Sequence, residues 1–319
     1  MTTTYFASGS NNPAEIRGFT RIGHAFGVTA PKVTKPGEAA LKATAGTGVE
    51  SFVDSGAFSE VEPNVPHKCD KKCKKAGSDC PGAGTLPFPS YPPYYMVVVD
   101  PMTHAKFTKV LALYTRLAVA LGNQVYLVVP DCVGHQDVTQ IRQAKYAGAI
   151  RQLRALGANL LVPMQKGEMT QVEFAEVTDE VLGFTDWIPS FPCNKAPTSP
   201  EELAAFIEAR NPPVVHLLGI GPRRKAFAKY VAAAGGARVL HDSCLITETV
   251  GKSNGRKNHC DETFKGPRVY TKAQTIAQEL LDQGIPGETH VKELGIVLAF
   301  TPLPPGTDRW AAIETGWAA

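Results

Sequence analysis

The sequence predicts an α/β fold of the (β/α)8 TIM-type barrel class. Apolar runs with strand character alternate with amphipathic stretches of helical periodicity, which requires crossover connections and therefore a parallel sheet with helices outside it. About seven or eight strands are expected, and this number suits a closed barrel better than an open sheet. A doubly wound Rossmann sheet is the alternative. However, no Gly-x-Gly-x-x-Gly motif follows the first strand, and Gly219-Ile220-Gly221-Pro222 lacks the third glycine.

The expected strands are short apolar runs closed by a polar residue or a glycine, and the expected helices lie between them. The strands cover residues 22–28, 51–54, 124–131, 159–165, 187–191, 214–219 and 238–242, with 96–99 as a further candidate. The helices cover residues 138–156, 171–182, 200–210 and 223–234. In such barrels the chemistry lies at the C-terminal ends of the strands. These ends carry Asp54, Asp131, Gln165, Gly219 and Asp242.

Length and composition suit one catalytic domain. With 319 residues, of which 43% are hydrophobic and 20% charged, the chain can form one barrel with a sizeable core. We expect a single domain over residues 1–319 with an insertion at 60–95. No run reaches transmembrane length and the N-terminal residues 1–5 lack the form of a signal peptide, so a soluble, cytoplasmic protein is expected. The net charge of +3 does not by itself indicate a nucleic-acid partner.

Asp54 and Asp242 each close a predicted strand, and this pair is the main indication of chemistry. Glycosyl transfer uses two carboxyl groups, because one attacks or shields the cationic sugar carbon while the other moves a proton on or off the departing base. The alternative is structural, since an aspartate after a strand can simply cap the helix that follows.

Three of the seven cysteines cluster with a histidine in a lysine-rich segment. Tetrahedral zinc takes four such ligands, so a structural Zn²⁺ site is predicted here, with free thiols as the alternative. The expected ligands are His67, Cys69, Cys73 and Cys80, and either Cys193 or Cys260 could supply the fourth position. Six residues separate the second and third of these cysteines, which disfavours a radical iron–sulfur loop, and no redox cofactor is expected. The strand-end cysteines, expected to be small buried hydrophobes, are Cys132, Cys193 and Cys244.

The insertion and two later loops concentrate basic residues. Prolines between residues 81 and 93 exclude a regular helix or a central strand, so this segment is expected to lie over the barrel mouth or against a partner. The basic loops could meet a phosphate backbone at the same mouth, although solvated loop faces are the alternative. The residues expected to contact nucleic acid are Arg223, Arg224, Lys252 and Arg256.

Five motifs in the same order resemble those of the tRNA-guanine transglycosylase superfamily. Asp54-Ser55-Gly56-Ala57-Phe58 is similar to its Asp-Ser-Gly-Gly-Phe signature. The segment 216–221, His-Leu-Leu-Gly-Ile-Gly, resembles its late-strand Leu-Met-Gly-Val-Gly, and 241–245, His-Asp-Ser-Cys-Leu, resembles its nucleophile strand Phe-Asp-Cys-Val-Leu. Pro130-Asp131-Cys132 and the Val-Pro-Met-Gln of 162–165 take the places of its two base-recognition strands. The resemblance covers residues 50 to 260, approximately.

The resemblance implies a role for each matching residue. Asp242 would attack C1′ of a target guanosine and form a covalent intermediate, and Asp54 would be the general acid and base that deprotonates the incoming 7-deazaguanine. The expected base-binding residues are Ser55, Phe58, Asp131, Gln165, Leu218 and Gly219. The chemistry of the side chains agrees, because a carboxylate accepts from the N1–H and amino donors of a guanine-like ring and an aromatic face stacks on any base.

Departures from the family pattern favour DNA over tRNA as the substrate. The tRNA enzymes carry a C-terminal zinc subdomain, whereas this chain has no cysteine after Cys260. Ala57 replaces the second signature glycine, and 188–192, Ile-Pro-Ser-Phe-Pro, stands where a glycine-rich strand is usual. These features are more similar to the DNA 7-deazaguanine transglycosylases of phages and bacterial modification islands, which insert bases such as preQ0 and protect DNA from restriction.

The sequence therefore predicts a base-exchange enzyme that replaces guanine in DNA by a preQ0-like base, in a bacterial cell or a phage-infected host. The target base must leave the stack, so opened or single-stranded DNA is favoured, with a helper protein as a potential partner. tRNA is the alternative partner. Two other classes stay open, namely a hydrolase of free nucleosides that uses the same aspartates and a DNA-binding barrel without catalysis.

Overall fold

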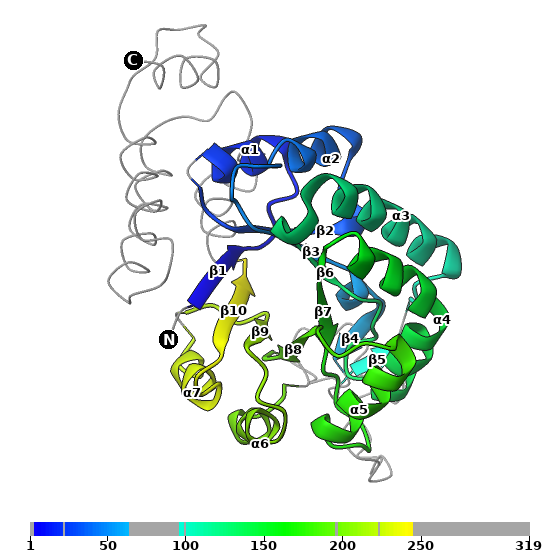
Figure 1. Cartoon of the computed structure of the whole chain (residues 1–319), viewed down its shortest axis with the longest axis vertical. Coiled ribbons are helices and arrows are strands. Elements are labelled where there is room, and N and C mark those ends of the chain that lie inside the picture. The colour runs from blue at the N-terminus through cyan, green and yellow to red at the C-terminus, as the bar shows by residue number, and fades with distance from the viewer. Residues whose placement is uncertain are drawn as a thin grey trace, which may run out of the picture.

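The protein forms a closed barrel of eight parallel strands surrounded by helices (Figure 1). The structure is a computed structural model and describes residues 3–21, 23–63, 96–98, 100–194, 197–222 and 224–244. The barrel strands are β1 (Thr3–Ala7), β2 (Phe26–Thr29), β3 (Ser51–Asp54), β6 (Val125–Val128), β7 (Asn159–Pro163), β8 (Ile188–Pro192), β9 (Val214–Leu218) and β10 (Arg238–Ser243). They follow each other around the barrel in the order β1-β2-β3-β6-β7-β8-β9-β10, and β10 pairs with β1 to close it. The predicted TIM-type fold is confirmed.

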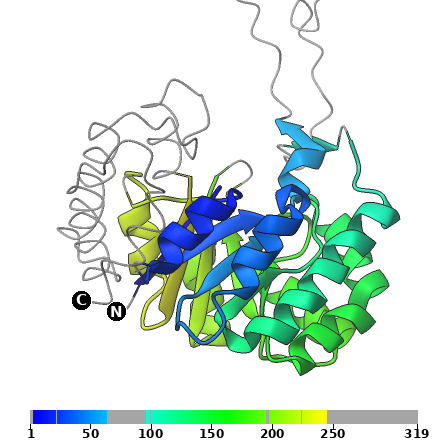
Figure 2. The same ribbon diagram turned by 90° about the horizontal axis from the view of Figure 1, so that it is seen from above.

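Helices connect successive strands and cover the outside of the barrel (Figures 1 and 2). The helices are α1 (Pro13–Arg21), α2 (Lys35–Lys42), α3 (His104–Leu121), α4 (Gln136–Ala155), α5 (Gln171–Leu182), α6 (Pro200–Arg210) and α7 (Phe227–Ala233). Short 3-10 turns η1 (Ala30–Lys32), η2 (Ala57–Glu60) and η3 (Gly122–Gln124) complete the described elements. No helix of this described part is both long and apolar enough to cross a membrane.

The structure corrects the predicted strand set in two places. Thr3–Ala7 is the strand that closes the barrel, and the sequence pattern did not indicate it. The further candidate at 96–99 is a strand, β5 (Met96–Val98), but it pairs antiparallel with β4 (Val61–Pro63) in a separate two-stranded sheet. These two strands flank residues 64–95, which lie outside the described residues, as do 245–319.

Two apolar layers stabilise the fold. Inside the barrel, Phe6, Phe52, Tyr126, Leu161 and Leu240 form one buried cluster. Outside it, the other faces of the strands pack against the helices, with fully buried side chains such as those of Phe26, Tyr114, Ile150, Phe174 and Phe206. Because both faces of every strand are covered, the strands read as continuous apolar runs in the sequence.

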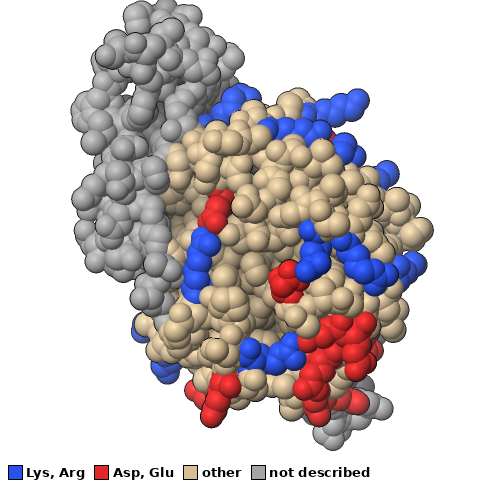
Figure 3. Space-filling model, viewed as in Figure 1, with Lys and Arg blue, Asp and Glu red and all other residues tan. Residues whose placement is uncertain are grey.

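The N-terminal end of the barrel carries an ion pair between Arg238 and Glu50. Arg238, the first residue of β10, lies 2.8 Å from Glu50 Oε2, and the Tyr126 hydroxyl donates a hydrogen bond of 2.7 Å to Glu50 Oε1. Figure 3 shows this end of the molecule, on which basic and acidic side chains are interspersed and acidic ones gather over α5. The exposed acidic residues there include Glu173, Glu176 and Glu180.

Candidate active site

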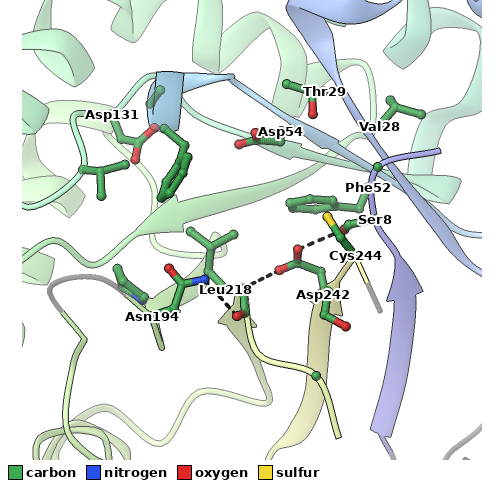
Figure 4. Close-up of a pocket in the computed structure, with 18 of the residues that line it drawn as sticks. Ser8, Val28, Thr29, Phe52, Asp54, Asp131, Asn194, Leu218, Asp242 and Cys244 are labelled. Carbon is green, nitrogen blue, oxygen red and sulfur yellow. Dashed lines mark hydrogen bonds between the residues drawn. The ribbon is translucent and has the colours of Figure 1, made fainter. Parts of the chain in front are cut away.

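The C-terminal ends of the strands enclose a cavity of about 550 Å³. Each of the eight barrel strands, or the loop that follows it, contributes to its lining. Figure 4 shows that Asp54, Asp131 and Asp242 approach this cavity from three sides, from β3, from the loop after β6 and from β10. The volume lies within the range of cavities that bind small organic ligands. The structure therefore brings the predicted carboxyl groups at 54 and 242 into one site.

Asp242, near the end of β10, is held by two donors. The Ser8 hydroxyl donates to Oδ2 at 2.9 Å, and the Gly219 N–H donates to Oδ1 at 2.7 Å. Gly219 has φ +74, and a Cβ there would lie 2.4 Å from Asn194 Nδ2, so the turn requires glycine. Burial raises the pKa of Asp242 to about 6, although the two hydrogen bonds oppose the rise. The side chain is thus an oriented carboxylate above that pH.

Asp54 closes β3 on the other side of the cavity and is half-buried. It accepts hydrogen bonds from the backbone N–H groups of Gly56 and Ser55, and Gly56 has φ +86 with Pro31 against it. Desolvation by the surrounding protein nevertheless raises the pKa of Asp54 to about 6, and the Lys32 charge opposes this only weakly. The charge of Asp54 in turn contributes to the raised pKa of Asp242. A carboxyl group with this pKa can exchange a proton near neutral pH.

Asp131, which follows β6, is buried and fixed from both sides. Ser55 Oγ donates to its Oδ1 at 3.0 Å, and Gln165 Nε2 donates to its Oδ2 at 2.9 Å. Burial, followed by the charge of Asp54, raises the pKa of Asp131 to about 7. The other end of the Gln165 amide accepts a bond of 2.8 Å from the Gly134 N–H. The Gly134 N–H therefore fixes the amide of Gln165, whose other end holds Asp131.

A buried ion pair supports the same wall of the cavity. Arg142 on α4 binds both carboxylate oxygens of Glu60, at 2.6 and 3.0 Å, and also donates to the carbonyl oxygen of Asp131. Glu60 is fully buried and belongs to η2, the turn that carries Phe58. The Phe58 ring lines the cavity with 44% of its surface exposed, which suits stacking on a flat ligand. Arg142 thus joins the Phe58 turn to the Asp131 loop.

The structure changes the interpretation of several predicted base-binding residues. Phe58, Asp131, Gln165, Leu218 and Gly219 line the cavity as expected. Ser55 does not line it, and its hydroxyl holds Asp131 instead. Gly219, expected to bind the base, donates its N–H to Asp242.

Other predictions fall partly outside the described residues. Arg224 lines the cavity, whereas Arg223, Lys252 and Arg256 lie outside the described part of the chain. The same holds for the expected zinc ligands, namely His67, Cys69, Cys73 and Cys80. Among the residues that are described, no three His, Cys, Asp or Glu side chains come together in a way that could hold a metal ion.

Several lining residues were not expected from the sequence. Ser8 and Asn11 follow β1, a strand that the sequence pattern did not predict. Lys32 follows β2, whose end lies one residue beyond the predicted strand at 22–28. Asn194 follows β8 and donates to the carbonyl oxygen of Gly219 at 3.0 Å. Cys244 was expected to be buried, but it is exposed and lines the cavity, one residue beyond the end of β10 at Ser243. Cys132 is buried as expected, and Cys193 is partly buried.

Comparisons with known proteins find similarity only at the level of structure. No family model and no curated protein matches the chain. A Coccidioides immitis protein described as a candidate fructose-1,6-biphosphate aldolase has a TM-score of 0.47 at 9% identity, over 93% of this chain and 88% of its own. N-acetylneuraminate lyase from Mycoplasma synoviae has a TM-score of 0.42 at 8% identity, over 99% and 97%. Fructose-bisphosphate aldolase from Campylobacter jejuni has a TM-score of 0.41 at 10% identity, over 93% and 88%. None of them bears on the transglycosylase resemblance, which stays a prediction.

Proposed function

We propose that the protein is an enzyme that exchanges guanine for a 7-deazaguanine base such as preQ0 in DNA, through a covalent intermediate on Asp242. The observation that carries this proposal is the placement of Asp54 and Asp242 on the walls of a single cavity at the C-terminal end of the barrel. Base exchange needs one carboxylate to attack the sugar carbon and a second to handle the proton of the base.

In the proposed first step, a carboxylate oxygen of Asp242 forms a bond to C1′ while the bond from C1′ to N9 of guanine breaks. The electron pair leaves with the base, and Asp54 supplies the proton that neutralises it. In the second step, Asp54 takes the N9 proton of the incoming deazaguanine, whose nitrogen displaces Asp242 and regenerates the free carboxylate. Both aspartates have a pKa of about 6, so each can be ionised when its step requires a base.

The other lining residues support recognition of a flat, polar base. Asp131 is fixed by two donors but retains acceptor capacity on both oxygens for N–H groups of a guanine-like edge. Phe58 and Leu218 supply apolar faces, and Arg224 and Lys32 add positive charge to the lining for a phosphate backbone. Gln165 orients Asp131 in this proposal, because its Nε2 donates to Asp131 while its Oε1 is held by the Gly134 N–H.

The decisive experiment is nucleoside mass spectrometry of DNA and tRNA from cells that express the protein and are supplied with preQ0. Deazaguanine nucleosides in DNA are the expected result, and their appearance only in tRNA would move the substrate to tRNA. Release of free guanine without insertion would identify a hydrolase. If DNA and tRNA are both unmodified and the purified protein binds DNA, the protein has a binding function and the proposed activity is wrong.

A further inference from the structure

His216 lies beside Asp242 in the barrel interior and is fully buried on β9. Its Nδ1 is 2.7 Å from Ser190 Oγ on the neighbouring strand β8. Its Nε2 is 3.5 Å from Asp242 Oδ1, and this nitrogen has no hydrogen-bond partner within the described part of the chain. Phe52 packs against the imidazole with ring centroids 5.2 Å apart, and Phe6 with centroids 6.4 Å apart. An unpartnered buried nitrogen is therefore held facing the carboxylate.

The contact between His216 and Asp242 is not an ion pair near neutral pH. Burial, followed by the neighbouring His241, lowers the pKa of His216 to about 3, so the ring is neutral. A neutral imidazole carries its proton on one nitrogen only. With the proton on Nε2, a donor faces Asp242 and the Ser190 hydroxyl donates to Nδ1. With the proton on Nδ1, a lone pair would face the carboxylate, which is unfavourable between two buried groups.

We infer that His216 is a positioning residue whose Nε2–H, selected by the Ser190 hydroxyl, holds Oδ1 of Asp242 in the orientation needed for attack on the sugar. The Gly219 N–H binds the same oxygen at 2.7 Å, so the two N–H groups together fix the carboxylate and favour its ionised form before attack. The role in catalysis rests on the proposed function. The tautomer and its effect on Asp242 do not depend on it.

Several other groups face this pair and must be kept constant in a test. Asp54 raises the pKa of Asp242 from β3, and Ser8 on the loop after β1 lowers it by hydrogen bonding. Cys193 after β8 lies close enough for its pKa to respond to Asp242. His241 on β10 neighbours His216, and Lys32 and Arg224 are the cations of the lining. Substitutions at His216 and Ser190 leave all of these in place.

The tautomer can be observed directly in the whole protein. Labelling histidine with ¹⁵N and recording long-range ¹⁵N–¹H spectra near pH 7.5 should show His216 protonated on Nε2 and unprotonated on Nδ1. Because this measurement uses the unsubstituted protein, it does not depend on any variant folding. A proton on Nδ1 would overturn the inference. Ser190→Ala should give a mixture of tautomers, and an unchanged spectrum would remove Ser190 from the arrangement.

Titration of Asp242 tests the effect on the carboxylate. In His216→Phe, the pKa of Asp242 should rise by about one unit, because a donor to the charged form is lost. The ¹³Cγ signal of labelled aspartate follows this titration, and the Asp242→Asn variant assigns the signal. His216→Gln retains an N–H at this place and should restore most of the difference. Equal values in His216→Phe, His216→Gln and the parent would refute the role of the N–H.

Activity then separates this inference from the proposed function. In a base-exchange assay, His216→Phe should lower kcat about tenfold with little change in KM and shift the acidic limb of the pH profile upward, while His216→Gln retains most of the rate. If the tautomer and the titration behave as expected but no base exchange is detected, the proposed function fails and the inference about Asp242 stands. His216 would instead act through packing if kcat falls in His216→Phe without a shift of the pH profile and His216→Gln does not restore the rate.

Discussion

The two ends of the barrel use charged side chains differently. At the N-terminal end, Glu50 is paired with Arg238 and accepts from the Tyr126 hydroxyl, so its charge is compensated where it lies. At the C-terminal end, Asp54, Asp131 and Asp242 face a single cavity, and within the described residues none of them forms an ion pair with a lysine or an arginine. The cations of that lining, Lys32 and Arg224, are exposed.

The carboxylate at the N-terminal end contributes to stability, whereas the three at the C-terminal end serve the proposed function. A nearby cation stabilises the charged form of a carboxylate, whereas burial without such a cation raises the pKa and destabilises the folded state when the group is ionised. Desolvation raises the pKa of Asp54, Asp131 and Asp242 alike, and strongly shifted pKa values concentrate at functional sites.

Asp242→Ala is expected to have the largest effect, because it removes the proposed nucleophile. Base exchange should fall by at least about 10³-fold, the scale seen when a nucleophile is removed from an enzyme. Incorporation of labelled preQ0 into DNA gives the rate, and gel analysis of a denatured reaction shows the covalent adduct. The thermal stability of the variant should be retained or increased. Unchanged incorporation would exclude Asp242 as the nucleophile.

Arg142→Met tests the support behind the cavity wall. The change leaves Glu60 buried without its partner, so the free energy of unfolding should fall by about 3–5 kcal/mol. Denaturant unfolding followed by circular dichroism measures this. The double variant Arg142→Met with Glu60→Leu should recover much of the loss, since it removes both charges. A single variant as stable as the parent would show that the ion pair contributes little.

Asp131→Asn tests the cost of an unpaired carboxylate through pH. The folded-state pKa of Asp131 is about 7 and lies above its unfolded value, so the folded state binds the extra proton and stability is lost as the pH rises from about 4 to 7. The variant lacks this loss. Its stability relative to the parent should therefore improve by a few kcal/mol between pH 4 and pH 8, because a tenfold difference in proton affinity corresponds to about 1.4 kcal/mol.

The Ser55 hydroxyl can turn to accept from the new amide, which makes Asp131→Asn a conservative change. Unfolding curves at several pH values measure the difference between variant and parent. A difference that does not vary with pH would mean that Asp131 has an ordinary pKa in the folded protein, and the contrast between the two ends of the barrel would weaken accordingly.

The sequence predicted the fold well where local signals were complete. The bounds of α5 and α6 agree with the prediction, because Thr170 with Glu173 and Ser199 with Glu202 form capping boxes at their starts. Strand β1 was missed because only its last three residues, Tyr5-Phe6-Ala7, form an apolar run. Its pairing with β10 depends on a contact between the two ends of the barrel sequence, which no local pattern encodes.

The site could be predicted only in part for a related reason. Parallel strands bring their C-terminal ends together, so the strand-end positions of Asp54, Asp131 and Asp242 were enough to place them at one mouth. The partners of each group depend on the register between strands. Sequence spacing could not show that Gln165 binds Asp131, or that the Gly219 N–H binds Asp242.

Glu50→Gln is expected to have the smallest effect and completes the comparison at the opposite end. Glu50 and Arg238 are partly exposed, so the free energy of unfolding should fall by no more than about 1 kcal/mol, with a smaller fall in high salt. Base exchange should be unchanged, because Glu50 lies at the other end of the barrel. Burial is the main cause of the raised pKa of Tyr126, and the charge of Glu50 is the second cause. Ultraviolet titration of the variant should therefore show a lower pKa for Tyr126 that still lies above the ordinary value for tyrosine. A loss of activity comparable to that of Asp242→Ala would show that the two ends are not independent, because a distant ion pair would then control the cavity.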